Sequence, residues 1–255
     1  MILVISPAKT QDFASPAPTG GFTQPEFLAE SARLVKLLRG LGLEELAALM
    51  GISGELAALN VGRYAAWHRP FTPANAKQAL FAFNGDAYGG LDAAALEPGD
   101  LDFAQDHLRI LSGLYGCLRP LDLIQPYRLE MKIRLGNPRG KDLYAFWGDR
   151  LTGALGRALG PAGVLVNLAS GEYFKAVDPG VAARVITPVF EDQGRDGFKV
   201  VSFYAKRARG LMCRYAIRGR LEDPEQLLDF REEGYRHDAG ASSGQRWVFR
   251  RVHAA

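Results

Sequence analysis

Residues 1–10 read MILVISPAKT and contain the first strand of the fold that we expect. The run Ile2–Ile5 is apolar and rich in β-branched residues, which is typical of a buried strand, and Ser6-Pro7 closes it. The small and polar residues Ala8, Lys9 and Thr10 follow directly. In open α/β sheets ligands bind at the carboxyl ends of strands, so Lys9 is a candidate binding residue. An ordinary exit from strand to loop would give the same pattern.

A second buried strand is predicted at Val164–Leu168, again followed by a polar, glycine-bearing exit over residues 169–175. A third strand is expected to end at residues 204–210. If these strands are parallel neighbours, their exits meet in one cleft. The side chains that we expect there are Lys9, Asn167, Ser170, Glu172, Lys206 and Arg209, together with Arg128 and Lys141.

The remaining pattern predicts a mixed α/β (α+β) fold, in which a mixed sheet is surrounded by helices. Hydrophobic residues at 47% and charged residues at 23% are ordinary for a globular chain with a sizeable core. We see no internal repeat and no long linker, so residues 1–255 are expected to form a single compact domain. A β-hairpin is predicted over 185–191 and 198–204, helices over 98–107 and 142–159, and a final strand over 246–252.

The stretch from His107 to Arg150 carries eight basic residues against four acidic ones, with aromatic residues interleaved. Within it, Ser112-Gly113-Leu114-Tyr115-Gly116 matches in part the turn of a helix-hairpin-helix element, whose backbone N–H groups hold a phosphate. The two glycines are one residue further apart than the usual Gly-Leu-Gly, so an ordinary turn remains the alternative. On the first interpretation Ser112, Gly113, Gly116 and Arg119 contact phosphate.

Charge is distributed unevenly, although the net charge is only +3. Residues 197–221 contain seven Lys or Arg and no acid, whereas residues 91–106 contain five acids and no Lys or Arg. Such blocks favour a phosphate-bearing partner, although an uneven solvated surface explains them equally well. The further phosphate-binding candidates are Lys132, Arg134 and Lys141, and Arg207, Arg214 and Arg218, which would share one helix face.

Several classes of protein are not indicated. The start of the chain lacks the basic segment of a signal peptide, and no apolar run is long enough for a membrane helix. Two cysteines and four widely spaced histidines predict neither a disulfide framework nor a metal site, and we expect no cofactor. A cytoplasmic protein without membrane contact is therefore expected, and no protein partner is implied.

Longer motifs point to a known family. The segments ISPAKT, LSGLYGCLRPLDLIQPYRLEM, GKDLYAFWGD, NLASGEYFKAV and SFYAKRARGLM closely resemble the YaaA family of peroxide-stress proteins, from Met1 to about Val252. The resemblance implies a cytoplasmic DNA-binding protein that limits iron-linked damage by hydrogen peroxide. It also implies a compact α/β domain with a positively charged cleft and a helix-hairpin-helix element near Leu111–Ile124. Cys117 and Cys213 lie where no required thiol is expected, which argues against cysteine-based sensing.

Two functions are therefore considered. The first is binding of double-stranded or structured DNA through its phosphates, with little sequence specificity. The second is an enzyme that acts on a nucleotide or another phosphorylated small molecule in the same cleft. In that case Glu172 would be the general base, with Lys206 and Arg209 holding the anion beside Lys9. The shape of the site discriminates between them, because a duplex needs a long basic groove and an enzyme needs a small pocket.

Overall fold

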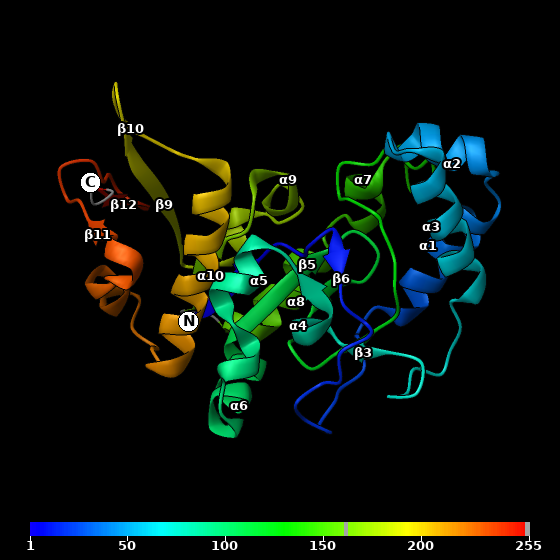
Figure 1. Ribbon diagram of the computed structural model, residues 1–255, viewed down its shortest axis with the longest axis horizontal. Helices are drawn as coiled ribbons and strands as arrows, with labels where there is room; N and C mark the ends of the chain where they lie inside the picture. Colours follow the sequence, from blue (N-terminus) through cyan, green and yellow to red (C-terminus); the bar gives the residue numbers. More distant parts are fainter. Residues whose placement is uncertain (161–162, 253–255) are drawn as a thin grey trace.

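The computed structural model describes residues 1–160 and 163–252. Its centre is a mixed sheet with the strand order β11-β12-β9-β8-β1-β5-β6, and β10 pairs with β9 at the side (Figure 1). The strands are β1 (Ile2–Ile5), β5 (Leu108–Ser112), β6 (Gly116–Leu118), β8 (Val164–Leu168), β9 (Arg184–Gly194), β10 (Gly197–Lys199), β11 (Arg236–His237) and β12 (Arg246–Arg251). Two short pairings lie outside it and join β2 (Thr10–Gln11) to β4 (Phe83–Asn84) and β3 (Lys77–Gln78) to β7 (Leu123–Ile124).

The first predicted strand lies in the middle of this sheet. β1 pairs in parallel with β8 on one side and with β5 on the other, and Ile5 lies opposite Leu168 and Ile110. Every residue of β1 is buried, as expected of a parallel strand that is covered on both faces. The predicted parallel neighbourhood of β1 and β8 is confirmed, and it places Ser6 and Ala169 side by side at one edge of the sheet.

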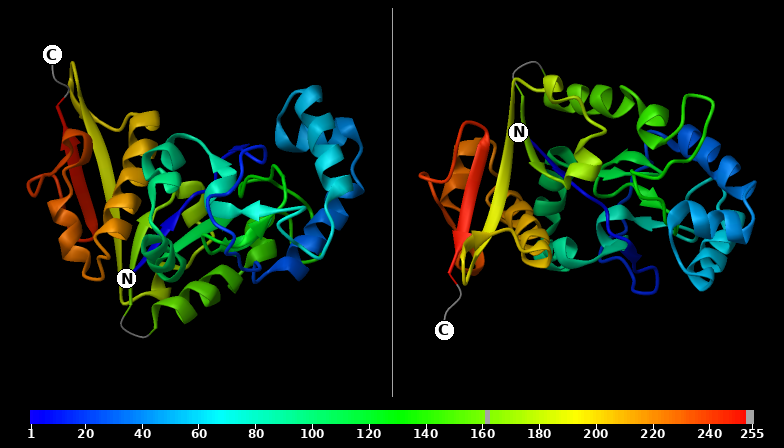
Figure 2. Two further views of the ribbon diagram at one scale, coloured as in Figure 1. Left: turned by 60° about the horizontal axis from the view of Figure 1, so that its bottom comes forward. Right: turned by 90° about the horizontal axis from the view of Figure 1, so that it is seen from above.

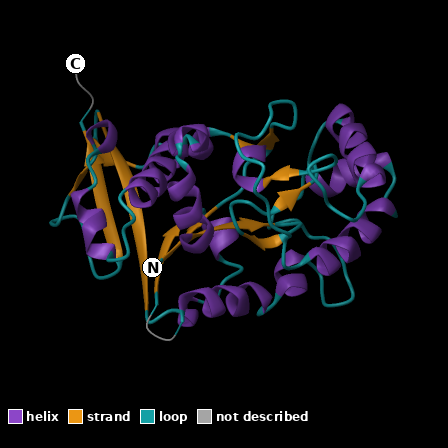
Figure 3. Cartoon of the chain, turned by 90° about the horizontal axis from the view of Figure 1, so that it is seen from below, coloured by secondary structure: helices purple, strands orange, loops and turns teal. Residues whose placement is uncertain are grey.

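Helices cover both faces of the central strands. Figure 2 shows α8 on one side and α5, α6 and α10 on the other, and Figure 3 shows helices on both sides of the strands. The helices α1 to α3 lie at the end of the molecule far from β12 (Figure 1). The α-helices are α1 (Leu28–Arg39), α2 (Leu43–Met50), α3 (Gly54–Ala66), α4 (Ala79–Ala82), α5 (Asp86–Leu91), α6 (Pro98–His107), α7 (Leu143–Trp147), α8 (Arg150–Leu159), α9 (Gly171–Phe174) and α10 (Ser202–Arg218). Short 3-10 helices are η1 (Ala93–Ala95), η2 (Pro179–Val181), η3 (Pro224–Asp229) and η4 (Glu232–Gly234). The mixed α/β class is thus confirmed.

Several predicted elements occur with altered bounds. The hairpin is confirmed as β9 and β10, but its second strand ends at Lys199 because α10 begins at Ser202. The helix predicted over 142–159 is two helices, because Gly148 adopts a positive φ of 47° and turns the chain. Asp142 caps α7 by accepting a hydrogen bond from the Ala145 N–H at 2.8 Å. The last strand is β12, as predicted.

The prediction of a helix-hairpin-helix element near Leu111–Ile124 is wrong. The residues from Leu108 to Leu118 form the antiparallel strands β5 and β6, in which Ser112 lies opposite Gly116. Both strands are almost entirely buried, so they lack the alternating pattern that would have identified them as strands. The two glycines have a packing role: a Cβ at Gly113 would lie 2.2 Å from the Leu129 carbonyl oxygen, and one at Gly116 would lie 2.7 Å from the Trp147 ring.

Residues 1–160 and 163–252 contain no helix that combines the length and the apolar character needed to cross a bilayer.

Candidate functional site

A pocket opens at the carboxyl ends of β1 and β8. The first residues beyond these strands are joined by hydrogen bonds: the Ser170 N–H donates to Ser6 Oγ at 2.9 Å, and the Ser6 hydroxyl donates to Ser170 Oγ at 3.3 Å. From the other side, the Tyr88 hydroxyl donates to the Ser6 carbonyl at 3.1 Å. These contacts fix the base of the pocket on strands that are themselves buried.

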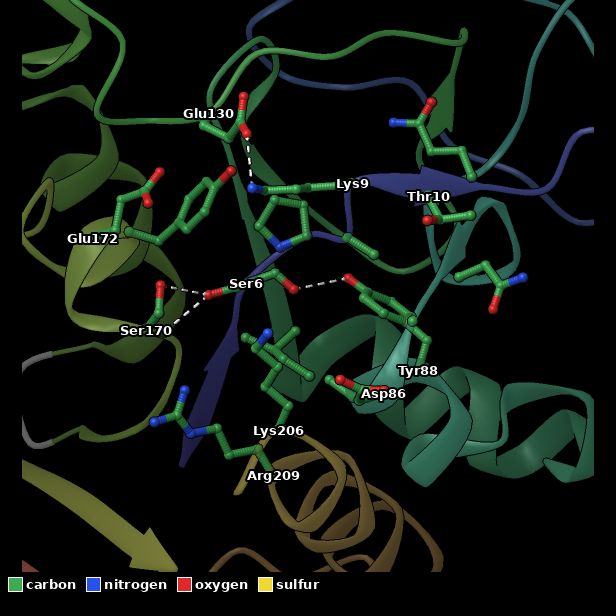
Figure 4. A pocket seen from close by; sticks show the side chains of 18 of the residues that line it. Ser6, Lys9, Thr10, Asp86, Tyr88, Glu130, Ser170, Glu172, Lys206 and Arg209 are labelled. Atoms are coloured by element: carbon green, nitrogen blue, oxygen red, sulfur yellow. Dashed lines mark hydrogen bonds and ion pairs between the residues drawn. The ribbon is translucent and has the colours of Figure 1, made fainter. Parts of the chain in front are cut away.

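The pocket has a volume of about 550 Å³, within the usual range of roughly 300–1,000 Å³ for small-molecule sites. Segments far apart in the sequence build its wall. The polar and charged side chains that line it are Ser6, Lys9, Thr10, Gln11, Asn84, Asp86, Tyr88, Tyr127, Arg128, Glu130, Ser170, Glu172, Tyr173, Lys206 and Arg209. Figure 4 shows Glu130 and Lys9 at one end, Ser6 and Ser170 between, and Lys206 and Arg209 at the other end.

The second end carries cations without acidic partners. Arg209 is half-buried, and this burial lowers the pKa of its guanidinium, which nevertheless stays charged. Lys206 is exposed one turn earlier on α10. Within the described residues neither side chain forms an ion pair, and Asp86, the carboxylate that α5 contributes to the wall, pairs with neither of them. A half-buried guanidinium without a counter-charge favours an anionic ligand.

The close contact of α5 with α10 positions these cations. A Cβ at Gly210 would lie only 1.7 Å from the Ala87 carbonyl oxygen, and one at Gly90 would lie 2.2 Å from the Arg207 carbonyl oxygen. Glycine at both positions therefore lets the two backbones touch, which brings Arg209 into the same wall as Asp86 and Tyr88.

The first end is a network of three charged groups. Glu130 is buried, and its Oε1 lies 3.1 Å from both Lys9 Nζ and Arg128 Nη2. Its Oε2 and the Arg128 Nε are buried without a hydrogen-bond partner among the described residues. Two cations on one carboxylate leave this end with a net positive charge.

Glu172 stands at the mouth of the pocket on α9. Its Oε1 accepts a hydrogen bond from the Lys132 N–H at 3.3 Å, and its Oε2 lies 4.0 Å from Lys132 Nζ. Burial raises the pKa of the neighbouring Tyr173, and it does the same for Tyr127 and Tyr88. These three phenols are therefore neutral at physiological pH and act as hydrogen-bonding groups, not as bases.

The structure brings six of the eight side chains together in the wall of the pocket: Lys9, Arg128, Ser170, Glu172, Lys206 and Arg209. Asn167 and Lys141 do not line it. Asn167 is buried in β8 and accepts a hydrogen bond from the Ala169 N–H at 3.0 Å. Residues 204–210 are also not a strand end as expected, because they lie in the first half of α10.

The other predicted phosphate contacts lie elsewhere. Ser112, Gly113 and Gly116 are buried, so the turn that they form cannot reach a phosphate outside the protein. Arg119 pairs with Asp122 at 3.3 Å. Lys132, Arg134 and Lys141 are exposed on the segment between β7 and α7.

The basic face of α10 is largely neutralised within the protein. Arg207 pairs with Glu233 at 2.6 Å, and Arg214 pairs with Asp92 at 3.5 Å and Glu232 at 3.4 Å. The Arg218 guanidinium donates to the Ala95 carbonyl at 2.8 Å. These partners come from the acidic block after α5 and from η4, so the blocks of opposite sign that the sequence shows meet in the folded chain.

Sequence reasoning missed the pocket residues Glu130, Asp86, Tyr88, Tyr127 and Tyr173. Glu130 sits between the buried Leu129 and Met131, a position that gave no sign of its contact with Lys9 about 120 residues earlier. The described residues also contain no group of three or more His, Cys, Asp or Glu side chains placed to hold a metal ion.

The fold and the pocket together define an α/β protein with a cationic pocket at the carboxyl edge of its sheet. A sequence model of the peroxide stress protein YaaA family matches residues 1–241. A UPF0246 protein of Burkholderia mallei (strain SAVP1) is 57% identical over 256 residues, covering 98% of each chain. One of Aromatoleum aromaticum is 59% identical over 258 residues, covering 98% of this chain and 99% of the relative. The chain therefore belongs to the peroxide stress protein YaaA family, which supports a role in the response to oxidative stress.

Proposed function

We propose that the protein acts in peroxide stress by binding DNA and limiting iron-linked damage to it, with one nucleotide unit held in the pocket. Arg209 is the observation that carries this proposal. Its half-buried guanidinium has no ion-pair partner among the described residues, and it lines the pocket beside Lys206. Guanidinium groups bind phosphate with directed, charge-assisted hydrogen bonds.

The shape of the pocket favours unpaired over fully paired DNA. Its volume of about 550 Å³ suits a single nucleotide and not a duplex. The arginines that a duplex track would use, Arg207 and Arg214, already have acidic partners. The preferred DNA is therefore single-stranded or structured with unpaired nucleotides, and contacts to phosphate give it little sequence specificity.

The test is fluorescence anisotropy with a labelled single-stranded oligonucleotide and the corresponding duplex at several salt concentrations. We expect tighter binding to the single strand, with an affinity that falls as salt rises. Arg209→Ala should weaken binding about tenfold to a hundredfold, since it removes a charge-assisted contact. It should also reduce the salt slope by about one.

Arg218→Ala is the matched control. It removes the same charge from the far end of the same helix, where the Arg218 guanidinium donates a hydrogen bond to the Ala95 carbonyl. Its affinity should stay within about twofold of the wild type, because it lies outside the pocket. Equal losses in the two variants would mean that net charge, and not the pocket, determines binding. Absence of binding to any DNA would refute the proposal.

An enzyme acting on a nucleotide or another phosphorylated small molecule is the second candidate. One observation favours it: the pocket combines Glu172 and Ser170 with Lys9, Lys206 and Arg209, as an acid–base site for an anionic substrate requires. Glu172 would be the general base. Thermal unfolding with a panel of nucleotides tests ligand binding, since a ligand at about 100 times its Kd adds about 2.7 kcal/mol.

A nucleotide that raises the Tm should then be incubated with wild type and Glu172→Gln, and product formation followed by chromatography. The enzyme hypothesis expects turnover that disappears in Glu172→Gln, while the Tm shift remains. If a ligand raises the Tm of both proteins and is recovered unchanged, the protein binds that ligand without converting it, and catalysis on that ligand is excluded.

A further inference from the structure

An exposed apolar patch lies next to the pocket, where β10 leads into α10. Val200 is 53% exposed and Phe203 is 52% exposed. Large apolar side chains clustered at the surface commonly mark a binding surface. Figure 1 shows that the β9–β10 hairpin projects beyond the first turn of α10 at one edge of the molecule.

The aromatic rings of this patch are held in place. The Phe203 ring lies against Tyr204, with 3.9 Å between the ring centroids. The Arg251 guanidinium in turn lies 4.5 Å from the centre of the Tyr204 ring. Phe203 therefore has support from within the protein while half of its surface faces solvent, which is the arrangement of a preorganised contact.

The charge around the patch indicates its occupant. Lys199 and Lys206 flank Phe203 in sequence and are exposed, and within the described residues neither forms an ion pair. No acidic residue occurs from residue 197 to residue 221. An exposed apolar ring between two lysines that form no ion pair among the described residues matches the stacked bases and backbone phosphates of a single nucleic-acid strand, which has both features.

Phe203 is also connected to the pocket through α10. Phe203 and Lys206 occupy positions i and i+3 of this helix, so their side chains are neighbours with about 5–6 Å between Cβ atoms. Lys206 lines the pocket with Arg209. A base on Phe203 would thus lie beside a phosphate held at the mouth of the pocket.

We propose that Phe203 is a stacking platform that carries a single DNA strand out of the pocket and along the first turn of α10. This inference rests on the proposed DNA-binding function and adds the path of the strand. It predicts that the platform contributes to binding of an oligonucleotide but not to binding of a mononucleotide, which ends inside the pocket.

The test compares Phe203→Ala, Phe203→Trp and Phe22→Ala with the wild type. Phe22 is 44% exposed and lies in the loop before α1, so its replacement controls for loss of an exposed phenyl ring. Binding of oligothymidylate is followed by anisotropy, and binding of thymidine monophosphate by calorimetry. Phe203→Ala should weaken oligonucleotide binding about fivefold to a hundredfold, the range for one lost stacking contact. Phe203→Trp should bind as tightly as the wild type or better, and Phe22→Ala should be unchanged.

The outcomes separate the two proposals. If Phe203→Ala binds the oligonucleotide like the wild type while Arg209→Ala does not, the platform is refuted and the pocket stands. If the wild type binds no DNA, both proposals fail. If Phe203→Ala instead dissociates a wild-type oligomer in size-exclusion chromatography and leaves DNA affinity unchanged, the patch joins copies of this chain and the platform is refuted.

Discussion

Replacing Gly210 with alanine tests whether the contact between α5 and α10 holds the pocket together. In the wild type the two backbones touch: a Cβ at Gly210 would lie 1.7 Å from the Ala87 carbonyl oxygen and 2.7 Å from the Leu91 nitrogen. Ordinary contact with a Cβ begins at 3.4 Å, so the helices must separate by about 3.4 − 1.7 = 1.7 Å. Backbone atoms cannot move aside as a side chain does.

The expected change in the free energy of unfolding of Gly210→Ala follows from two opposing effects. A separation of this size forfeits much of the dispersion energy between the helices and costs about 3 kcal/mol or more, the upper end of the range for overpacking. Alanine in place of glycine inside a helix gains about 1 kcal/mol of propensity. The expected net loss is therefore at least about 2 kcal/mol, or a Tm lower by about 4–8 °C for a chain of this size.

Gly89→Ala is the control in the same helix pair. The nearest atom to a Cβ at Gly89 is Arg207 Nη1 at 3.8 Å, an ordinary contact with a movable side chain. Its stability should match or slightly exceed that of the wild type. Urea unfolding of the three proteins, followed by circular dichroism, measures the difference. A Gly210→Ala protein within about 0.5 kcal/mol of Gly89→Ala would refute the argument that the backbone contact requires glycine.

Two further predictions concern charge and thiols. The double variant Arg207→Glu, Arg214→Glu should lower the free energy of unfolding by about 1–2 kcal/mol, because each new carboxylate faces the acids that the arginines now bind. Urea unfolding at low and high salt measures this loss. Unchanged stability at low salt would contradict the prediction. The thiols should resist Ellman's reagent and peroxide in the folded protein, since burial raises the pKa of Cys117 to about 12 and that of Cys213 further. Stoichiometric labelling before unfolding would contradict that expectation.

The sequence was informative about strands whose apolar runs end in polar residues. Ile2–Ile5 and Val164–Leu168 were recognised because both are short, apolar and followed by small polar residues, and their parallel pairing gave the base of the pocket. The helix-hairpin-helix prediction near Leu111–Ile124 failed for a physical reason. A strand buried on both faces has no alternation, and the glycines needed for close packing at Gly113 and Gly116 look the same as glycines of a phosphate-binding turn.

The residues of the candidate site could be predicted where a charged side chain follows a predicted strand, as at Lys9, Glu172 and Lys206. Glu130 was not predictable, because its contact with Lys9 depends on tertiary packing. The arginines of α10 show the converse. The helix sequence shows several arginines but not which of them form ion pairs. Acidic residues from other elements pair with Arg207 and Arg214. Arg209 forms no ion pair among the described residues, and its burial lowers the pKa of its guanidinium.

The central position of β1 has a consequence during synthesis. Both of its neighbours are made much later, since Ile5 pairs with Ile110 and with Leu168, which is 168 − 5 = 163 residues further along the chain. At about 5–20 residues per second, roughly 8–30 s pass between the translation of β1 and that of β8. During that interval an apolar strand has unpaired backbone groups on at least one edge. An apolar strand therefore remains incompletely paired at the beginning of the nascent chain, and the pocket cannot be complete until Arg209 has been made, when about four fifths of the chain exists.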